Sequence, residues 1–201
     1  MSIGLCLGLT EPALIRGCLR LGSLLCRERD DSQMSKATRE ARLRILRSLH
    51  EVLSVDFQNI KLDYSPEHRY RLLIPWDGND YFLFDFSTKV KDAFRCAFVV
   101  DLDQESSERR RSFQEILGDF PEEVADILGS PVVGRTSDAN LAKEGLRSWT
   151  KISTHRRKGV HCMHRLPELD WNDTEAAVES IAPHAYRFVE GMNSLLQRYR
   201  P

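Results

Sequence analysis

The fold is decided by the stretch RYRLLIPWDGNDYFLFDFSTKVKDAFRCAFVVDL, residues 69–102. One apolar run ends at the pair Asp77-Gly78, and a second apolar run begins directly after it. Gly tolerates the positive φ that a tight turn requires. The pattern therefore predicts a β-hairpin with strands near residues 68–76 and 81–87.

Further strands follow from similar patterns. Residues 94–102 are predicted to be a strand that is either buried on both faces or central in the sheet, because their apolar side chains are nearly continuous. Residues 147–153 and 159–165 are β candidates on either side of a basic loop, and residues 129–145, rich in Gly, Ser, Asp and Asn, are expected to be loop. The sequence thus predicts an α+β fold with a small antiparallel sheet of about five strands.

Helices are expected before, between and after these strands. From residue 37 to 55, leucines recur at helical spacing, which predicts an amphipathic N-terminal helix. The polar region 104–128 predicts a central pair of short helices. Residues 174–199 carry the longest apolar stripe, and they predict a C-terminal helix with Asn172 as its N-cap and a kink or break at Pro183.

Composition predicts a single ordinary domain, residues 34–201, with a substantial core. The chain has 201 residues, 41% hydrophobic and 29% charged, and its formal charge of -1 provides no global field that would recruit nucleic acid or an anionic membrane. Five cysteines without C-x-x-C spacing indicate reduced thiols and a cytoplasmic location. No apolar stretch approaches the ~20 residues of a membrane span, so no membrane partner is expected.

Residues 1–33 differ from the rest, and two interpretations are open. The segment that starts at Met34 reads like the beginning of a bacterial protein, so residues 1–33 would be an extension from an over-extended gene start. Alternatively, residues 12–27 form a short amphipathic helix with apolar side chains near one face. Mass spectrometry of the native N-terminus distinguishes the two.

A resemblance rests on packing positions, namely the segment from Ile116 to Gly129, Trp149, and the closing segment from Phe188 to Pro201. Together with the order of the predicted elements, these positions resemble a small bacterial domain of uncharacterised function that is often found behind nuclease-like cores in restriction and phage-defence proteins. The match covers residues 37–201. The resemblance implies an accessory or binding role in defence or nucleic-acid transactions.

The run FVVDLDQE, residues 98–105, offers a catalytic alternative. It looks like the opening motif of the haloacid-dehalogenase phosphatases, an apolar strand followed by Asp-x-Asp, here Asp101 and Asp103. That resemblance implies Mg²⁺-dependent phosphoryl transfer, in which Asp101 attacks phosphorus and Asp103 acts as general acid. The other interpretation is a strand-to-helix turn in which Asp103 caps a helix beginning near Gln104. Glu105 departs from the family motif, which favours the second interpretation.

Potential soft-metal ligands cluster in residues 155–164. On a strand, Cys162 and His164 share one face while His161 points to the other, so few of these side chains can meet. Structural zinc usually takes four ligands and catalytic zinc three. The expectation is therefore a half-buried strand with Cys162 and His164 towards the core, without a metal or another cofactor.

The basic loop Arg156-Arg157-Lys158 is the preferred interaction site. Lys and Arg neutralise phosphates without reading sequence, and an aromatic side chain, Trp149 or Tyr70, is predicted to stack on an exposed base. We therefore expect a non-enzymatic binding or accessory module whose partner is DNA or RNA. The apolar strands would equally complete a homodimer or another protein interface, so those partners stay open.

Overall fold

The structure is a computed structural model that describes residues 39–65, 69–76, 78, 80–99, 115–152 and 159–199. The chain divides into two compact units, Met1–Glu40 and Ala41–Pro201, and the sheet belongs to the second. Residues 1–33 lie outside the described part, so both interpretations of that segment stay predictions. Among the described residues, no helix combines the length and the apolar character needed to cross a bilayer.

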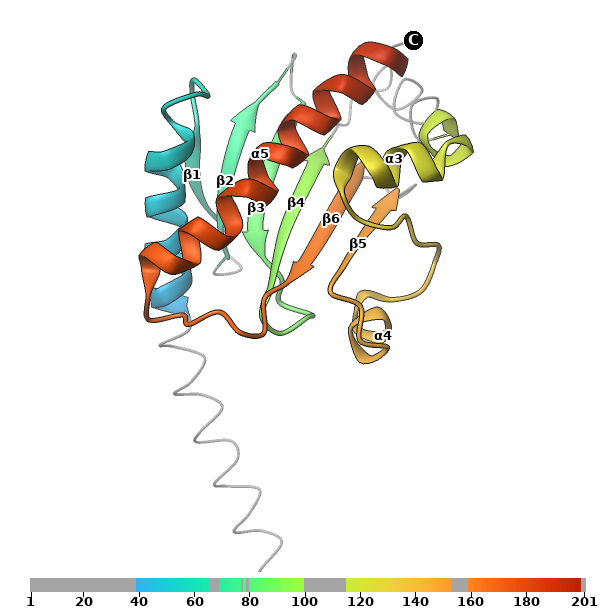
Figure 1. Ribbon diagram of the computed structural model, residues 1–201. Helices are drawn as coiled ribbons and strands as arrows, with labels where there is room; N and C mark the ends of the chain where they lie inside the picture. Colours follow the sequence, from blue (N-terminus) through green and yellow to red (C-terminus); the bar gives the residue numbers. More distant parts are fainter. Residues whose placement is uncertain are drawn as a thin grey trace, which may run out of the picture. The chain divides into compact units, whose positions relative to one another are not determined.

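The second unit contains a six-stranded sheet in which every neighbouring pair of strands is antiparallel (Figure 1). The strands are β1 (Lys61–Ser65), β2 (Arg69–Pro75), β3 (Tyr81–Phe86), β4 (Ala93–Val99), β5 (Ser148–Ile152) and β6 (Val160–Arg165), in the order β1-β2-β3-β4-β6-β5. The α+β class is confirmed, and all five expected strands are present. The additional strand is β1, at the edge of the sheet. Its sequence, KLDYS, contains no apolar run that would reveal it as a strand.

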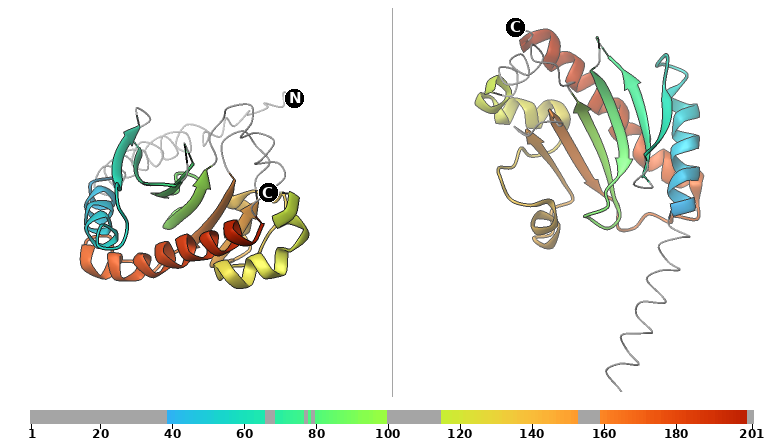
Figure 2. Two further views of the ribbon diagram at one scale, coloured as in Figure 1. Left: turned by 90° about the horizontal axis from the view of Figure 1, so that it is seen from above. Right: turned by 180° about the vertical axis from the view of Figure 1, so that it is seen from behind.

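Helices cover one face of this sheet (Figure 1). The described helical segments are residues 39–53, residues 115–119, α3 (Pro121–Leu128), α4 (Asp138–Lys143) and α5 (Thr174–Tyr199). The helix that ends at residue 53, α3 and α5 all lie on the same face, and we call the opposite one the second face (Figure 2). The N-terminal helix, the central helical pair and the C-terminal helix are confirmed, whereas α4 lies in a region that the sequence predicts as loop.

The main core fills the space between the sheet and these helices. Cross-strand pairing places Phe84 opposite Cys96 and Cys96 opposite Cys162, so one row of buried side chains crosses three strands on the helix-facing side. Leu49 and Phe188 pack against this row from the helices. Fully burying one such apolar side chain contributes roughly 1.5–3 kcal/mol. As predicted from its continuous apolar sequence, β4 is a central strand that is buried on both faces.

The turn between β2 and β3 has the geometry that the Asp-Gly pair predicts. Gly78 adopts a φ of +65°, where a side chain would be strained. The N–H of Trp76 donates to the carbonyl of Asp80 at 2.8 Å and closes the turn. The two strands then pair from Pro75 opposite Tyr81 onwards.

Two details of α5 differ from the sequence-based expectation. Its N-cap is Asp173, not Asn172, because the Asp173 Oδ1 accepts the N–H of Ala176 at 3.0 Å. Pro183 does not divide the helix, which is continuous from Thr174 to Tyr199. Proline leaves the carbonyl of Glu179 without its helical donor, but both residues are exposed, so water can satisfy that carbonyl.

The outer edge of β5 is covered by the segment that precedes α4. The N–H of Thr150 donates to the carbonyl of Pro131 at 2.8 Å, and the carbonyl of Thr150 accepts the N–H of Val133 at 2.9 Å. The chain then continues into α4, which begins at Asp138. This path brings an acidic side chain to the second face of the sheet.

Candidate functional site

The second face carries an ion pair within otherwise apolar strands. Arg95 interrupts the apolar sequence of β4, and cross-strand pairing places it opposite Asp85 of β3. The Arg95 Nε donates to the Asp85 Oδ1 at 2.7 Å, and its Nη2 forms a second bond with the Oδ2. Asp85 is only 1% exposed. Because a buried carboxylate requires such a partner, the pair holds both side chains in place.

Asp138 is a second acidic anchor on the same face. Its Oδ1 accepts the Trp149 indole N–H at 2.9 Å and lies 2.7 Å from the Lys151 Nζ. The His161 Nε2 is 3.9 Å from the same oxygen. Burial alone would raise the pKa of Asp138, but the side chains of His161, Lys151 and Trp149 hold it well below its usual range. Asp138 is therefore a carboxylate throughout the neutral pH range.

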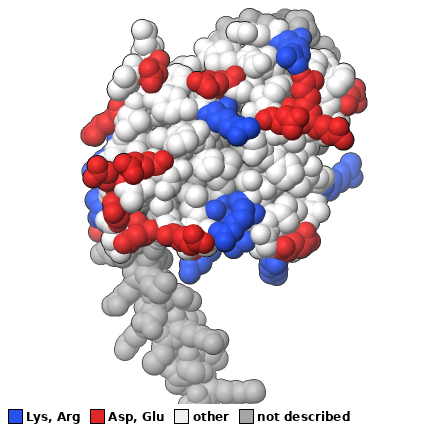
Figure 3. Space-filling model, in the orientation of Figure 1, with Lys and Arg blue, Asp and Glu red and all other residues white. Residues whose placement is uncertain are grey.

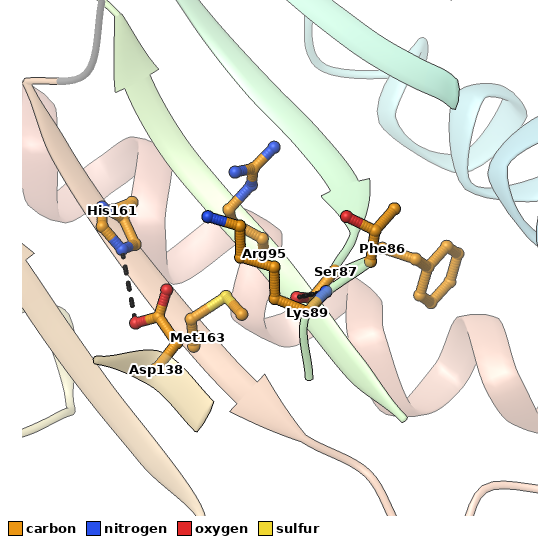
Figure 4. A pocket seen from close by; sticks show the side chains of 8 residues that line it. Phe86, Ser87, Lys89, Arg95, Asp138, His161 and Met163 are labelled. Carbon is orange, nitrogen blue, oxygen red and sulfur yellow. Dashed lines mark hydrogen bonds and ion pairs between the residues drawn. The ribbon is translucent and has the colours of Figure 1, made fainter. Parts of the chain in front are cut away.

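Both groups reach one pocket (Figure 4). The pocket is lined by Phe86, Ser87, Thr88, Lys89, Arg95, Asp138, His161 and Met163. Ser87 shapes its rim, because its Oγ accepts the N–H of Lys89 at 3.2 Å and the N–H of Val90 at 3.0 Å. These bonds close a tight turn after β3 and bring Lys89 to the pocket. Within the described part of the chain, the Lys89 ammonium forms no ion pair.

The balance of charge makes the pocket suited to an anionic group. The charged side chains that line it or are bonded to its lining are Lys89, Arg95 and Lys151, balanced in part by Asp85 and Asp138. N–H donors of cationic groups bind carboxylate and phosphate oxygens strongly where water is partly excluded. On the helix-covered face, by contrast, Lys and Arg side chains lie scattered among acidic ones (Figure 3).

Trp149 lacks the exposure that base stacking requires. Its side chain is 0% exposed and packs in a small second core with Val90, Leu141 and Met163. The ring therefore presents no face to a nucleic-acid base, which corrects the role expected from the sequence. Through its indole N–H, Trp149 instead positions Asp138.

Cys162 and His164 face the helix side of β6, as predicted, but β6 is buried on both faces and not half-buried. Among the described residues they are not part of a metal site. The Cys162 Sγ lies 3.0 Å from the Thr150 Oγ1, and the His164 ring stacks on His184 with centroids 4.0 Å apart. Burial raises the pKa of Cys162 to about 11, although hydrogen bonds from Thr150 and Ser130 oppose it, so Cys162 is a thiol. No group of three or more His, Cys, Asp or Glu side chains within the described ranges has the geometry of a metal site.

Five predicted site residues lie outside the described residues, namely Asp101, Asp103, Arg156, Arg157 and Lys158. The strands that lead to them are described. Because Phe98 and Ile152 both lie opposite Val160, β4 and β5 end, and β6 begins, at the same end of the sheet. The strands beside β4 run antiparallel to it. In α/β enzymes, the ligand site lies where the carboxyl ends of parallel strands meet. The end of β4 has no such arrangement, because its neighbouring strands are antiparallel to it.

The sequence did not indicate Lys89, Arg95, Lys151 or Asp138 as parts of a site. Arg95 offers a usable signal, because a cation inside an apolar strand requires a partner and Asp85 lies in the preceding strand. Asp138 offers none, because it lies in a Ser- and Asn-containing segment typical of a surface loop.

Comparison of the chain with protein-family models, with curated proteins and with solved structures finds no match. The basis for a functional assignment is therefore the chemistry of the pocket and the sequence around it.

Proposed function

We propose that this chain is a non-enzymatic binding module for a phosphate-bearing ligand, and that this ligand is nucleic acid. The observation that supports the proposal is a pocket on the second face that is lined by Lys89 and Arg95, with Lys151 ion-paired to the lining residue Asp138. Contacts from Lys and Arg to phosphates supply most of the non-specific affinity for nucleic acid, and they need no recognition of bases.

The sequence spacing around the predicted basic loop also supports this function. Arg156 follows Lys151 by five residues, and His161 follows Lys158 by three. Lys151 and His161, which lines the pocket, thus belong to β5 and β6, the paired strands that residues 153–159 connect. We expect a polyanion that contacts the loop to reach the pocket as well.

We further propose that the module works in the cytoplasm as an accessory part of a nucleic-acid or defence system. The thiols of Cys96 and Cys162 are buried and form no disulfide, which suits a reducing compartment. Restriction, nuclease or phage-defence genes beside the gene for this chain would support the defence role, and unrelated neighbours in several genomes would contradict it.

The binding function is tested by fluorescence anisotropy with labelled single-stranded DNA and RNA over a series of salt concentrations. We expect Lys89→Ala to weaken binding and to reduce the slope of log K against log salt by about one. A variant with Arg156→Ala, Arg157→Ala and Lys158→Ala should reduce that slope further, because it removes three cations.

Arg147→Ala is the matched control, because Arg147 lies in an exposed ion pair with Glu168 and does not line the pocket. It removes the same charge as Lys89→Ala and should bind nearly as tightly as the wild type. Absence of binding by the wild type, or equal losses in the two variants, contradicts the proposal. Mg²⁺-dependent phosphatase activity that Asp101→Asn abolishes would establish the catalytic alternative instead.

A further inference from the structure

We propose that Asp138 competes with the ligand for the cationic part of the pocket, so that a multiply charged phosphate group displaces its carboxylate and a singly charged anion does not. The inference rests on the proposed binding function. It adds a specificity-determining residue and the charge class of the phosphate that enters the pocket: a terminal phosphate of the nucleic acid, which carries two charges, and not an internal phosphodiester, which carries one.

Asp138 meets the same donors that an anionic ligand would use. Its Oδ1 is 2.7 Å from the Lys151 Nζ and 3.9 Å from the His161 Nε2. Carboxylate and phosphate oxygens accept equivalent bonds from ammonium and imidazole groups. In the close-up, the Asp138 carboxylate points towards His161 at the pocket wall (Figure 4). The protein's own carboxylate thus occupies a position suited to an anion.

Of the two carboxylates beside the pocket, Asp138 is the one that can move away when a ligand binds. The Asp85 side chain is 2% exposed and forms two bonds with Arg95 across central strands. The Asp138 side chain is 23% exposed and belongs to α4, a helix of six residues. Moving Asp138 requires an adjustment in one short surface helix, whereas moving Asp85 would disrupt the sheet.

Charge selectivity follows from the number of cations that each anion can satisfy. While Asp138 pairs with Lys151, a singly charged anion can neutralise only Lys89. A phosphate group with two charges repels the Asp138 carboxylate more strongly, and on displacement it would pair with Lys89, which lines the pocket, and with Lys151, which Asp138 releases. Displacement of the Asp138 carboxylate is therefore favourable when the ligand is the multiply charged phosphate group, and not when it is a singly charged anion.

The test compares the wild type with Asp138→Asn by isothermal titration calorimetry, with inorganic pyrophosphate and acetate as probes. Asparagine removes the charge but keeps an oxygen that can accept the Trp149 indole N–H. We expect the wild type to bind pyrophosphate and not acetate. Asp138→Asn should bind pyrophosphate about tenfold more tightly and should also bind acetate.

Asp63→Asn is the matched control for a general effect of charge. Asp63 lies on the sheet in an ion pair with Arg71, at 3.1 Å, and does not line the pocket. The variant loses the same charge as Asp138→Asn, and its affinity for pyrophosphate should equal that of the wild type. An equal gain in both variants overturns the inference.

A second measurement uses the wild-type protein and so does not depend on the folding of a variant. Displacement of Asp138 removes or moves the acceptor of the Trp149 indole N–H. We expect the NMR signal of this N–H, assigned by comparison with Trp149→Phe, to shift when pyrophosphate binds and to stay unchanged with acetate. An unshifted signal in the pyrophosphate complex overturns the inference.

The inference and the proposed function fail in different ways. If Lys89→Ala weakens binding but Asp138→Asn binds pyrophosphate no more tightly than the wild type, Asp138 is a positioning residue for Lys151. In that case the inference is rejected and the binding function stands. If neither protein binds pyrophosphate or an oligonucleotide, the binding function is rejected together with the inference.

Discussion

His164 is a residue whose buried environment couples stability to pH. Its side chain lies beneath α5, is 6% exposed and stacks on His184. Burial, followed by the positive charges of His184 and Arg187, lowers its pKa to about 3. The imidazole is therefore neutral in the folded protein at neutral and mildly acidic pH.

We expect this residue to make the free energy of unfolding decrease as pH falls from about 6.5 towards 3. In that window the unfolded chain binds a proton at His164 that the folded chain does not bind. At about pH 5 the loss is about 2 kcal/mol relative to neutral pH. Urea unfolding of the wild type and of His164→Leu, at about pH 5 and at neutral pH, measures this loss of stability. Equal pH dependence in the two proteins contradicts the prediction.

At the scale of elements, local sequence signals identify long or strongly patterned segments. The stripe of α5 and the Asp-Gly turn between β2 and β3 are visible because each pattern is complete within its own segment. By contrast, α4 has six residues and depends on its Ser137 cap and on burial of Leu141. Similarly, β1 depends on pairing with β2. Such elements are stabilised by neighbours that local sequence does not reveal.

The candidate site shows the same limit. Arg95 and Asp85 belong to consecutive strands, so their pairing follows once the strands are recognised. Asp138 reaches the site from α4, and His161 reaches it because β6 pairs with β4. Both are distant in sequence from Arg95 and Asp85. The sequence predicts a nucleic-acid contact for Trp149, because its aromatic character is visible in the sequence and its burial is not.

Pro183 offers a test of how α5 is stabilised. Pro183→Ala should raise the free energy of unfolding by about 2 kcal/mol, because alanine restores a helical N–H. This value includes a smaller opposing effect, since proline also restricts the unfolded chain. Chemical denaturation of the two proteins measures the difference. A less stable variant would show that the proline ring packs favourably at its exposed position.

At the scale of the whole molecule, the described core is confined to one compact unit. Its buried apolar side chains extend from Ala41 to Leu195. Because the chain divides into two compact units near residue 40, a chain that begins at Met34 should unfold at the same urea midpoint as the full chain, and with the same dependence on urea. Circular dichroism measures both quantities. A lower midpoint in the shorter chain would indicate that residues 1–33 stabilise the unit.

The two edges of the described sheet also affect behaviour in concentrated solution. At one edge, Pro131 and Val133 already use the outward hydrogen-bonding groups of Thr150. At the other, β1 is only five residues long and carries Lys61 and Asp63. Covered edges and short, charged ones both oppose the addition of strands from other molecules. Fibrillar aggregation by edge-to-edge stacking is therefore disfavoured at both borders of this sheet.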